Sequence, residues 1–399
     1  MTLLRRCLGF HRYAFAVQYN GTPFLGFSYQ GPRGEDCLVP NSDLRGLHSV
    51  EGRIRLALSS LVNGKQPTST STDPHEEGYY PNPNWEQFQV SSRTDRGVHA
   101  LHNTFHVDIR KAQTATETET WNESSLVRGL NYHLVRQARA HVQSIQQSST
   151  FSTLDHVVTS RNSSTSRPPP LPSHVLYNFE HDIRILSCRL IPPDLKLVNK
   201  HYNPQDPQPQ DQQPSHVDWN ARFSATRRTY LYRILVCNPQ AAQGVEYGIP
   251  FESNTCWKVW KDGGELNVKA MQEAAKYLSG TRDYSSFRGK SCMRSSPIVT
   301  VDGIQIIQDS TTLFPKDVLP TWMDHSNPPQ VLSIVISGNA FLYRQVRNMV
   351  GCLVDVGRHK LHPEDVLEIV QACDRSQAPS MAPAQGLFLV KVEHGDFKF

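Results

Sequence analysis

Short segments in which every second residue is apolar mark the strands that the chain is expected to form. In the first of them Tyr13, Phe15 and Val17 share one parity, and the run ends at the turn dipeptide Asn20-Gly21. Comparable runs predict further strands at 85–90, around 105–109, and at 229–236, 331–336 and 387–392.

Apolar residues spaced three and four positions apart predict four helices. In the first, over 50–61, Val50, Ile54 and Leu58 share one face, and Ser49 is the expected N-cap. The second covers 267–278 and has Asn267 as its N-cap. The other two are expected at 340–356 and at 363–373, the last with a proline at its start.

Three polar stretches rich in Ser, Thr, Pro or Gln interrupt this series near 65–84, 143–173 and 199–215. Segments of this composition cannot bury enough apolar surface to fold, so we interpret them as disordered insertions. We divide the chain into a basic N-terminal extension at 1–12, an N-terminal α+β catalytic domain at 13–215 and a C-terminal α+β domain at 216–399.

The order of strands and helices repeats roughly twice along the chain. This order predicts the α+β class, with two ferredoxin-like, RRM-like halves built on mixed, mostly antiparallel sheets. We expect the two halves to flank a basic active-site cleft.

One carboxylate stands out in the link between the strands at 85–90 and 105–109. Asp95 lies in a glycine-containing turn, with Arg93 two residues before it and Arg96 directly after it. We expect the flanking arginines to hold the carboxylate ionised. The same arginines would attract a phosphate backbone, so the segment suits an aspartate that acts on nucleic acid.

Two further segments combine charge with aromatic or apolar residues. Residues 221–233 hold several arginines together with Tyr230 and Tyr232, a mixture typical of surfaces that grip phosphates and stack bases. In 339–351, Arg347 lies close to the apolar face of the predicted helix and therefore needs a partner, for which a carboxylate is the natural choice. Taken alone, the first segment is better explained as a solvated strand with a tyrosine in the core, and Arg347 is better explained as part of a surface ion pair.

These segments, in this order, resemble the TruA family of tRNA pseudouridine synthases. Residues 91–101 resemble its catalytic pattern G-R-T-D-A-G-V-H-A, with Ser92 in place of the first Gly and Arg96 in place of the Ala. Residues 221–232 resemble A-R-F-S-A-T-x-R-x-Y-x-Y, and 339–351 resemble N-A-F-L-x-x-x-V-R-N-x-V-G. Shorter matches at 19–27, 283–288 and 386–389 extend the resemblance over nearly all of the chain outside the three insertions, closest to the animal TruA-like branch.

The resemblance implies a reaction and a set of site residues. It implies isomerisation of uridine to pseudouridine in tRNA, in the anticodon arm, by a homodimer that needs no metal and no small-molecule cofactor. Asp95 would be catalytic, with Arg347 pairing with it, Tyr230 stacking on the uracil and Arg93 filling the gap left by the displaced base. The expected substrate-binding residues are Arg93, Tyr230, Arg347, Arg96, His99 and Arg222.

Two alternatives come from different function classes. The first is a non-catalytic RNA-binding or tRNA-chaperone protein of the same fold, for which the departures at Ser92 and Arg96 are the local argument. The second is a metal-dependent nuclease that uses His99, His102 and His106. If these residues lie on a strand, His102 and His106 are roughly 13 Å apart, too far to share one ion.

The composition of the chain excludes only a few function classes. The net charge of +4 permits a nucleic-acid partner without requiring one, so the argument depends on local clusters. The eight cysteines contain no C-x-x-C pair, which favours free thiols in a reducing compartment over a zinc ribbon. Because no run of about 18 apolar residues is present, no membrane span is expected.

The first twelve residues carry three arginines, and no acidic residue precedes Glu35. This composition is compatible with a mitochondrial presequence and with a basic fringe that contacts RNA. We expect a mitochondrial location, with the cytoplasm or the nucleus as alternatives.

Overall fold

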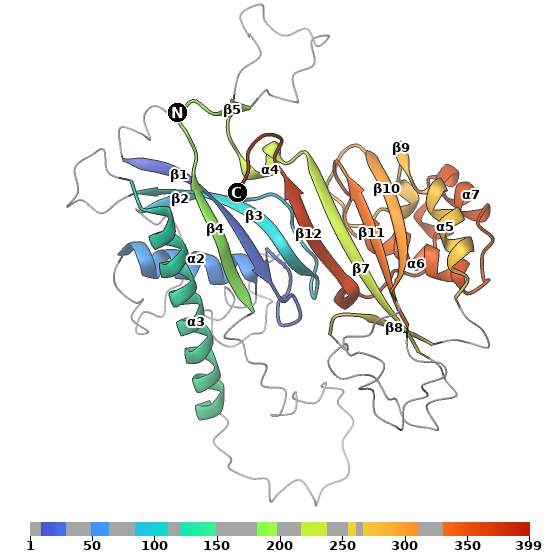
Figure 1. Cartoon of the computed structure of the whole chain (residues 1–399), viewed down its shortest axis with the longest axis horizontal. Helices are drawn as coiled ribbons and strands as arrows, with labels where there is room; N and C mark the ends of the chain where they lie inside the picture. The colour runs from blue at the N-terminus through green and yellow to red at the C-terminus, as the bar shows by residue number, and fades with distance from the viewer. Residues whose placement is uncertain are drawn as a thin grey trace, which may run out of the picture.

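The computed structural model describes residues 9–28, 49–63, 84–110, 120–148, 182–197, 217–237, 254–260, 266–309 and 330–399. A large twisted sheet runs through these residues (Figure 1). Its strands are β1 (Phe10–Tyr19), β2 (Trp85–Val90), β3 (His99–Arg110), β4 (Ile183–Leu190), β7 (Arg227–Cys237), β8 (Trp257–Trp260), β9 (Gly280–Asp283), β10 (Ile298–Asp309), β11 (Gln330–Gly338) and β12 (Leu387–Glu393).

The strand order β4-β1-β3-β12-β7-β11-β10-β9 shows how the two halves of the chain meet, with β2 added beside β3 and β8 beside β7. The last strand, β12, lies in the middle, parallel to β3 and antiparallel to β7. The predicted α+β class and the mostly antiparallel pairing are confirmed. The strands of the two halves form one continuous sheet.

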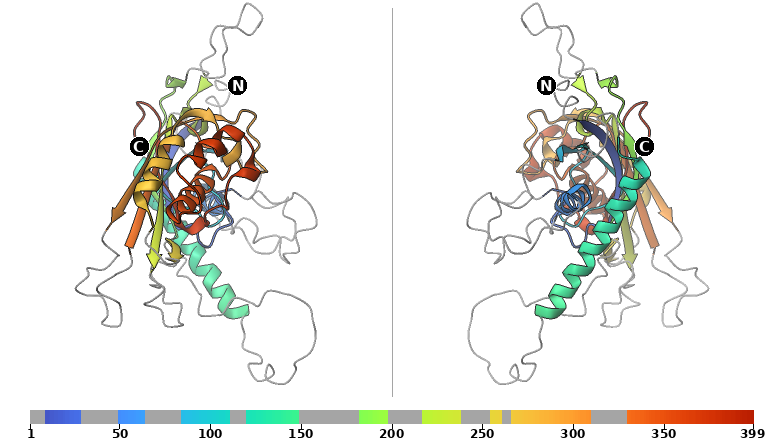
Figure 2. Two further views of the ribbon diagram at one scale, coloured as in Figure 1. Left: turned by 90° about the vertical axis from the view of Figure 1, so that its right-hand side faces the viewer. Right: turned by 90° about the vertical axis from the view of Figure 1, so that its left-hand side faces the viewer.

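Helices cover the sheet. In the edge-on views, α2 (Val50–Asn63), α6 (Gln345–Gly357) and α7 (Asp365–Ala372) lie on the same side of the strands (Figure 2). The remaining helical segments are α3 (Glu123–Ser148), α4 (Ala221–Ser224), α5 (Val268–Tyr277) and the 3₁₀ turns η6 (Ser285–Phe287), η8 (Arg375–Gln377) and η9 (Ala384–Gly386); a small ribbon joins β5 (Lys196–Leu197) to β6 (Val217–Asp218).

One hydrophobic core extends across both halves. The alternation along β1 turns Phe15 and Val17 into this core, where the Phe15 ring stacks on Phe105 with centroids 4.9 Å apart. The same core includes Leu58 of α2 and Met349 of α6. Because apolar side chains from both halves share one interior, the two halves are held together by burial as well as by strand pairing.

Most of the predicted elements are present, and two predicted helix caps are confirmed. The Ser49 hydroxyl accepts a hydrogen bond from the Gly52 amide at 3.0 Å, and the Asn267 side chain accepts one from Ala270 at 3.0 Å. The helix expected at 340–356 begins only at Gln345, since Arg344 has a left-handed backbone with φ +62°. The structure adds elements for which no prediction was made, among them α3, β4, β9 and β10.

The boundary of the predicted N-terminal extension needs correction. Strand β1 already begins at Phe10, and the guanidinium of Arg12 within it bonds to Asp108 at 2.6 Å and to the Trp219 carbonyl at 2.7 Å. Arg12 is therefore part of the fold. Residues 1–8 lie outside the described residues, as do nearly all of the predicted insertions. Of these insertions only Asn84 and 143–148 are described, and 143–148 continue α3.

Candidate active site

Asp95 lies in a tight turn between β2 and β3. The Val98 amide donates to the Asp95 carbonyl at 3.1 Å, and Gly97, the third residue of the turn, has φ +77°. A positive φ at this position is the signature of a type II turn and favours glycine. The sequence Asp95-Arg96-Gly97-Val98 therefore fixes the direction in which the carboxylate leaves the backbone.

The loop that follows β1 supports this turn through backbone contacts. The Phe27 amide donates to the Thr94 carbonyl at 3.1 Å, and the Gly97 amide donates to the Phe24 carbonyl at 3.3 Å. A Cβ atom on Gly21 would lie 2.0 Å from the Val98 carbonyl oxygen. Glycine is needed there because the two backbones touch.

The Asp95 carboxylate is paired with Arg347 of α6. Arg347 Nη1 lies 3.1 Å from Asp95 Oδ2, and Arg347 Nε donates to the Ala382 carbonyl at 2.8 Å. The side chain of Arg347 is 10% exposed and that of Asp95 is 18% exposed. The predicted pairing is confirmed, and the second hydrogen bond of the guanidinium fixes the angle at which it meets the carboxylate.

Tyr230 of β7 is buried beside this pair. Its phenol oxygen lies 3.0 Å from the Ser92 hydroxyl, and its ring meets the edge of Phe341 with centroids 5.2 Å apart. Burial raises the pKa of Tyr230, so the phenol stays neutral at physiological pH. Asp95, Tyr230 and Arg347, which are far apart in the sequence, are thus brought together by the central strands.

The other predicted substrate-binding residues divide into exposed and buried groups. Arg93, Arg96 and Arg222 are exposed, and the Arg222 guanidinium lies over the ring of Phe223, 5.5 Å from its centroid. These arginines provide positive charge at the surface around the turn and around α4.

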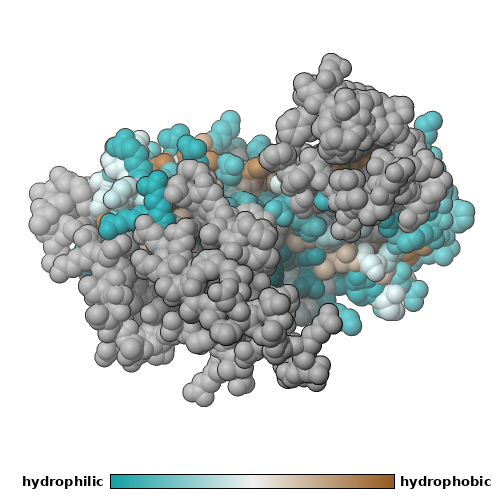
Figure 3. Space-filling model, turned by 90° about the horizontal axis from the view of Figure 1, so that it is seen from below, coloured by the Kyte–Doolittle hydropathy of each residue, from teal (hydrophilic) through white to brown (hydrophobic). Residues whose placement is uncertain are grey.

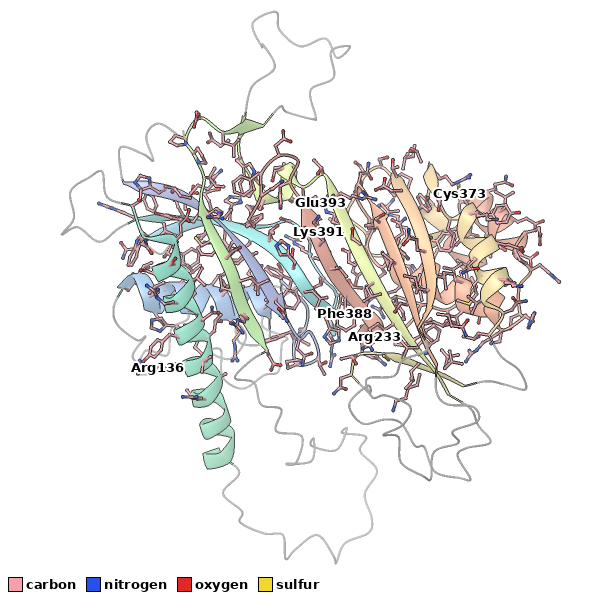
Figure 4. All side chains as sticks on the ribbon, viewed as in Figure 1. Arg136, Arg233, Cys373, Phe388, Lys391 and Glu393 are labelled. Atoms are coloured by element: carbon pink, nitrogen blue, oxygen red, sulfur yellow. The ribbon has the colours of Figure 1, made fainter. Side chains whose placement is uncertain are left out.

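His99, by contrast, is buried at the start of β3. Its Nδ1 accepts from the Gly21 amide at 3.1 Å, and its Nε2 donates to the Asn254 carbonyl at 2.9 Å. Its ring stacks on Phe388, which lies near the start of β12 (Figure 4). Burial lowers the pKa of His99, so the ring is neutral. Through the hydrogen bond to Gly21, His99 holds the loop after β1 against the turn that contains Asp95.

A buried polar cluster for which no prediction was made anchors the residues before Asp95. His394, after β12, lies 2.7 Å from the Thr104 hydroxyl through Nε2 and 2.7 Å from the Ser224 hydroxyl through Nδ1. The Thr104 hydroxyl in turn bonds to that of Ser91. Burial lowers the pKa of His394 to about 3, so the ring is neutral and serves as both donor and acceptor. No sequence spacing marks this cluster, because its members come from four separate segments.

His99, His102 and His106 all lie on β3, as the alternating pattern predicted. Within the described residues, no group of three or more His, Cys, Asp or Glu side chains has an arrangement that could hold a metal ion. In the same part of the chain, no helix is both long enough and apolar enough to cross a membrane. The described residues on the face seen from below are mostly hydrophilic, with small separate hydrophobic areas (Figure 3).

Comparison with known proteins identifies the family of the chain. A family model described as tRNA pseudouridine synthase matches residues 274–394. The tRNA pseudouridine synthase A of Ehrlichia chaffeensis is 32% identical over 384 residues, which cover 96% of this chain and 100% of that protein. The chain belongs to the tRNA pseudouridine synthase A family.

Other members of the tRNA pseudouridine synthase A family match over different lengths. The protein of Jannaschia sp. is 25% identical over 388 residues, 97% of each chain. The protein of Wolbachia pipientis is 38% identical over 176 residues, which cover 44% of this chain and only 60% of that protein. The resemblance to the TruA family is confirmed; its closeness to the animal branch stays a prediction.

Proposed function

We propose that the chain is a tRNA pseudouridine synthase that isomerises uridine to pseudouridine in the anticodon arm of tRNA, with Asp95 as its catalytic residue. Membership of the tRNA pseudouridine synthase A family supports the reaction class. The observation that carries the assignment of Asp95 is its pairing with the largely buried Arg347 beside Tyr230. The carboxylate, the guanidinium and the aromatic ring that the proposed reaction needs are therefore supplied by Asp95, Arg347 and Tyr230.

The reaction breaks the bond between N1 of uracil and C1′ of the ribose, rotates the base and joins C5 to C1′, after which C5 loses its proton. The base must leave the helical stack for this to happen, since these atoms are not accessible within a duplex. The Asp95 carboxylate would either attack the sugar or take a proton from it. In both routes Arg347 holds the carboxylate in place, and the ring of Tyr230 provides the surface for the uracil.

Exposed cations around the site suit the tRNA backbone. Arg93 and Arg96 flank Asp95 in the turn. On the α6 side, the segment 288–296 contains Lys290 and Arg294, both exposed, and no acidic residue. Arg288 braces the backbone of this segment by donating to the Cys292 carbonyl at 2.9 Å. Such a surface binds phosphates with a strong dependence on salt.

The decisive experiment measures tritium release from uridine labelled at C5 in unmodified tRNA transcripts, because C5 loses its hydrogen only after the new bond forms. The wild type should release tritium, and Asp95→Asn, which keeps the shape of the side chain, should lose at least a thousandfold in rate with unchanged tRNA binding. If the wild type binds tRNA but releases no tritium from any transcript, the non-catalytic RNA-binding function replaces this proposal. Transcripts that lack single anticodon-arm uridines would identify the position.

The assembly and the location belong to the same proposal. We propose a homodimer, on the basis of the family resemblance, and sedimentation of the purified chain would test it. We also propose a mitochondrial location, for which the support is the pair Arg5 and Arg6 before β1 and the absence of acidic residues before Glu35. Imaging of the tagged full chain in cells would distinguish the mitochondrion from the cytoplasm and nucleus.

A further inference from the structure

The guanidinium of Arg228, on β7, donates hydrogen bonds to three backbone carbonyls. Its Nη1 donates to Ala225 at 3.0 Å and to Asn339 at 2.7 Å, and its Nη2 donates to Ser91 at 3.1 Å. A planar guanidinium is suited to this task, since its five N–H groups point in fixed directions. In the described part of the chain, Arg228 forms no ion pair with a carboxylate, and its guanidinium donates its hydrogen bonds to these carbonyl oxygens.

These carbonyls belong to the segments that supply the active site. Ser91 follows β2 and lies four residues before Asp95, whereas Asn339 follows β11 and leads into α6, which carries Arg347. Arg228 itself lies two residues before Tyr230 on the same strand, so the two side chains emerge from the same face of β7. One side chain therefore joins the backbones that carry all three groups.

Both distant acceptors are themselves fixed. The Ser91 amide donates to the Thr104 carbonyl of β3 at 2.9 Å, and the Asn339 amide donates to the Thr300 carbonyl of β10 at 3.1 Å. The Asn339 side chain also accepts from the Thr300 amide at 3.1 Å. Arg228 therefore connects two hydrogen-bonded backbone segments, one that leads to Asp95 and one that leads to Arg347, and the fixed spacing of its Nη1 and Nη2 atoms sets the separation of the two carbonyls.

We propose that Arg228 is a positioning residue of the isomerisation, which sets the separation of the Asp95 turn from the segment that leads to Arg347. This inference rests on the proposed function. Arg228 acts through backbone groups and needs no contact with the reacting atoms. Its loss should slow the chemical step, because the carboxylate would no longer be held at the right distance from C1′.

The test uses Arg228→Lys, which keeps the positive charge and removes the planar fork. Its neighbour Arg227 offers a matched control, since Arg227 is exposed and pairs with Asp302 at 3.0 Å. Tritium release in a single turnover at saturating tRNA gives the rate of chemistry, and filter binding gives Kd. Arg228→Lys should lower the rate at least 30-fold and change Kd less than threefold, whereas Arg227→Lys should leave both within twofold.

A second variant covers the case in which Arg228→Lys fails to fold. In Arg228→Ala, guanidinium ions at tens of millimolar should restore part of the rate, whereas methylammonium at the same concentration should not. Wild-type rates in Arg228→Lys, or a rise in Kd in proportion to the lost rate, would overturn the inference and leave the proposed function intact. Absence of tritium release by the wild type would overturn both.

Discussion

The hydroxyl of Ser92 lies 3.0 Å from the phenol oxygen of Tyr230. Ser92 occupies a position at which the family pattern G-R-T-D-A-G-V-H-A has glycine, so this bond connects a departure from the pattern to the residue expected to stack on uracil. The Ser92 carbonyl also accepts from the Asn103 side chain at 2.8 Å. The departure at Ser92 therefore adds a support for Tyr230 and leaves the backbone of the turn held by Asn103.

This bond predicts a non-additive pair of mutations. Ser92→Ala and Tyr230→Phe should each lower the free energy of unfolding by about 1 kcal/mol, the usual value of a buried hydrogen bond. The double variant should lose little more than either single one, which gives a coupling of about 1 kcal/mol in a double-mutant cycle measured by urea unfolding. Fully additive losses would show that the two hydroxyls do not bond in solution.

The close approach of the Gly21 and Val98 backbones predicts a steric effect. Gly21→Ala should lower the free energy of unfolding by about 3 kcal/mol and reduce the isomerisation rate, because a Cβ would lie 2.0 Å from the Val98 carbonyl oxygen and displace the Asp95 turn. Gly303→Ala is the matched control, since a Cβ there meets nothing within 4 Å. Thermal unfolding and tritium release measure both quantities, and equal behaviour of the two variants would contradict the prediction.

The buried His394 predicts a pH dependence of stability. Burial lowers the pKa of His394 to about 3 in the folded chain, whereas the unfolded chain binds this proton near pH 6.5. The unfolded state therefore binds more protons below pH 6.5, and stability falls as the pH decreases. Between pH 7 and pH 5 this group should remove about 2 kcal/mol from the free energy of unfolding.

His394→Gln isolates this contribution, because glutamine can hydrogen-bond but does not titrate. Urea unfolding at pH 7 and pH 5 should show a smaller pH-dependent loss in the variant by about 2 kcal/mol. His359→Gln, at an exposed position, should retain the wild-type dependence. An unchanged loss in His394→Gln would mean that other groups cause the acid sensitivity.

The exposed cations of 288–296 predict a salt-dependent contribution to tRNA binding. Combined Lys290→Gln and Arg294→Gln should raise Kd at least tenfold and reduce the slope of log affinity against log salt by about 1.5, because two phosphate contacts are lost. The rate at saturating tRNA should stay unchanged. The control is Arg136→Gln on α3, at the other end of the molecule from β10 (Figure 4); a slope equal to that of the control would exclude phosphate contacts by this segment.

The sequence predicted local elements well where the periodicity was strong. The alternating run that begins at Tyr13 and the caps at Ser49 and Asn267 are present, because each depends on side chains within a few residues of one another. It also predicted the pairing of Asp95 with Arg347, since a charge close to an apolar helix face needs a partner and the family resemblance identified that partner as Asp95.

Other contacts between residues that are far apart in the sequence could not be predicted. The carbonyl groups that accept hydrogen bonds from Arg228 cannot be predicted from the residue types, because any amino acid can supply a backbone oxygen. The role of His99 was also not predictable: strand periodicity gives its face, but only the folded chain brings Gly21 and Asn254 to its ring nitrogens. Pairing of β12 with both β3 and β7 depends on contacts between segments that are far apart in the sequence, as between Leu389 and Tyr230.

The central place of β12 has a consequence for biosynthesis. Because β12 follows every other strand of the sheet in the sequence, β3 and β7 emerge from the ribosome long before the strand that joins them. Until then, each half of the nascent chain has an unpaired edge and an incomplete site. A ribosome that stops before residue 387 therefore releases a polypeptide whose two halves lack their connecting strand, so the site can form only after β12 has been translated.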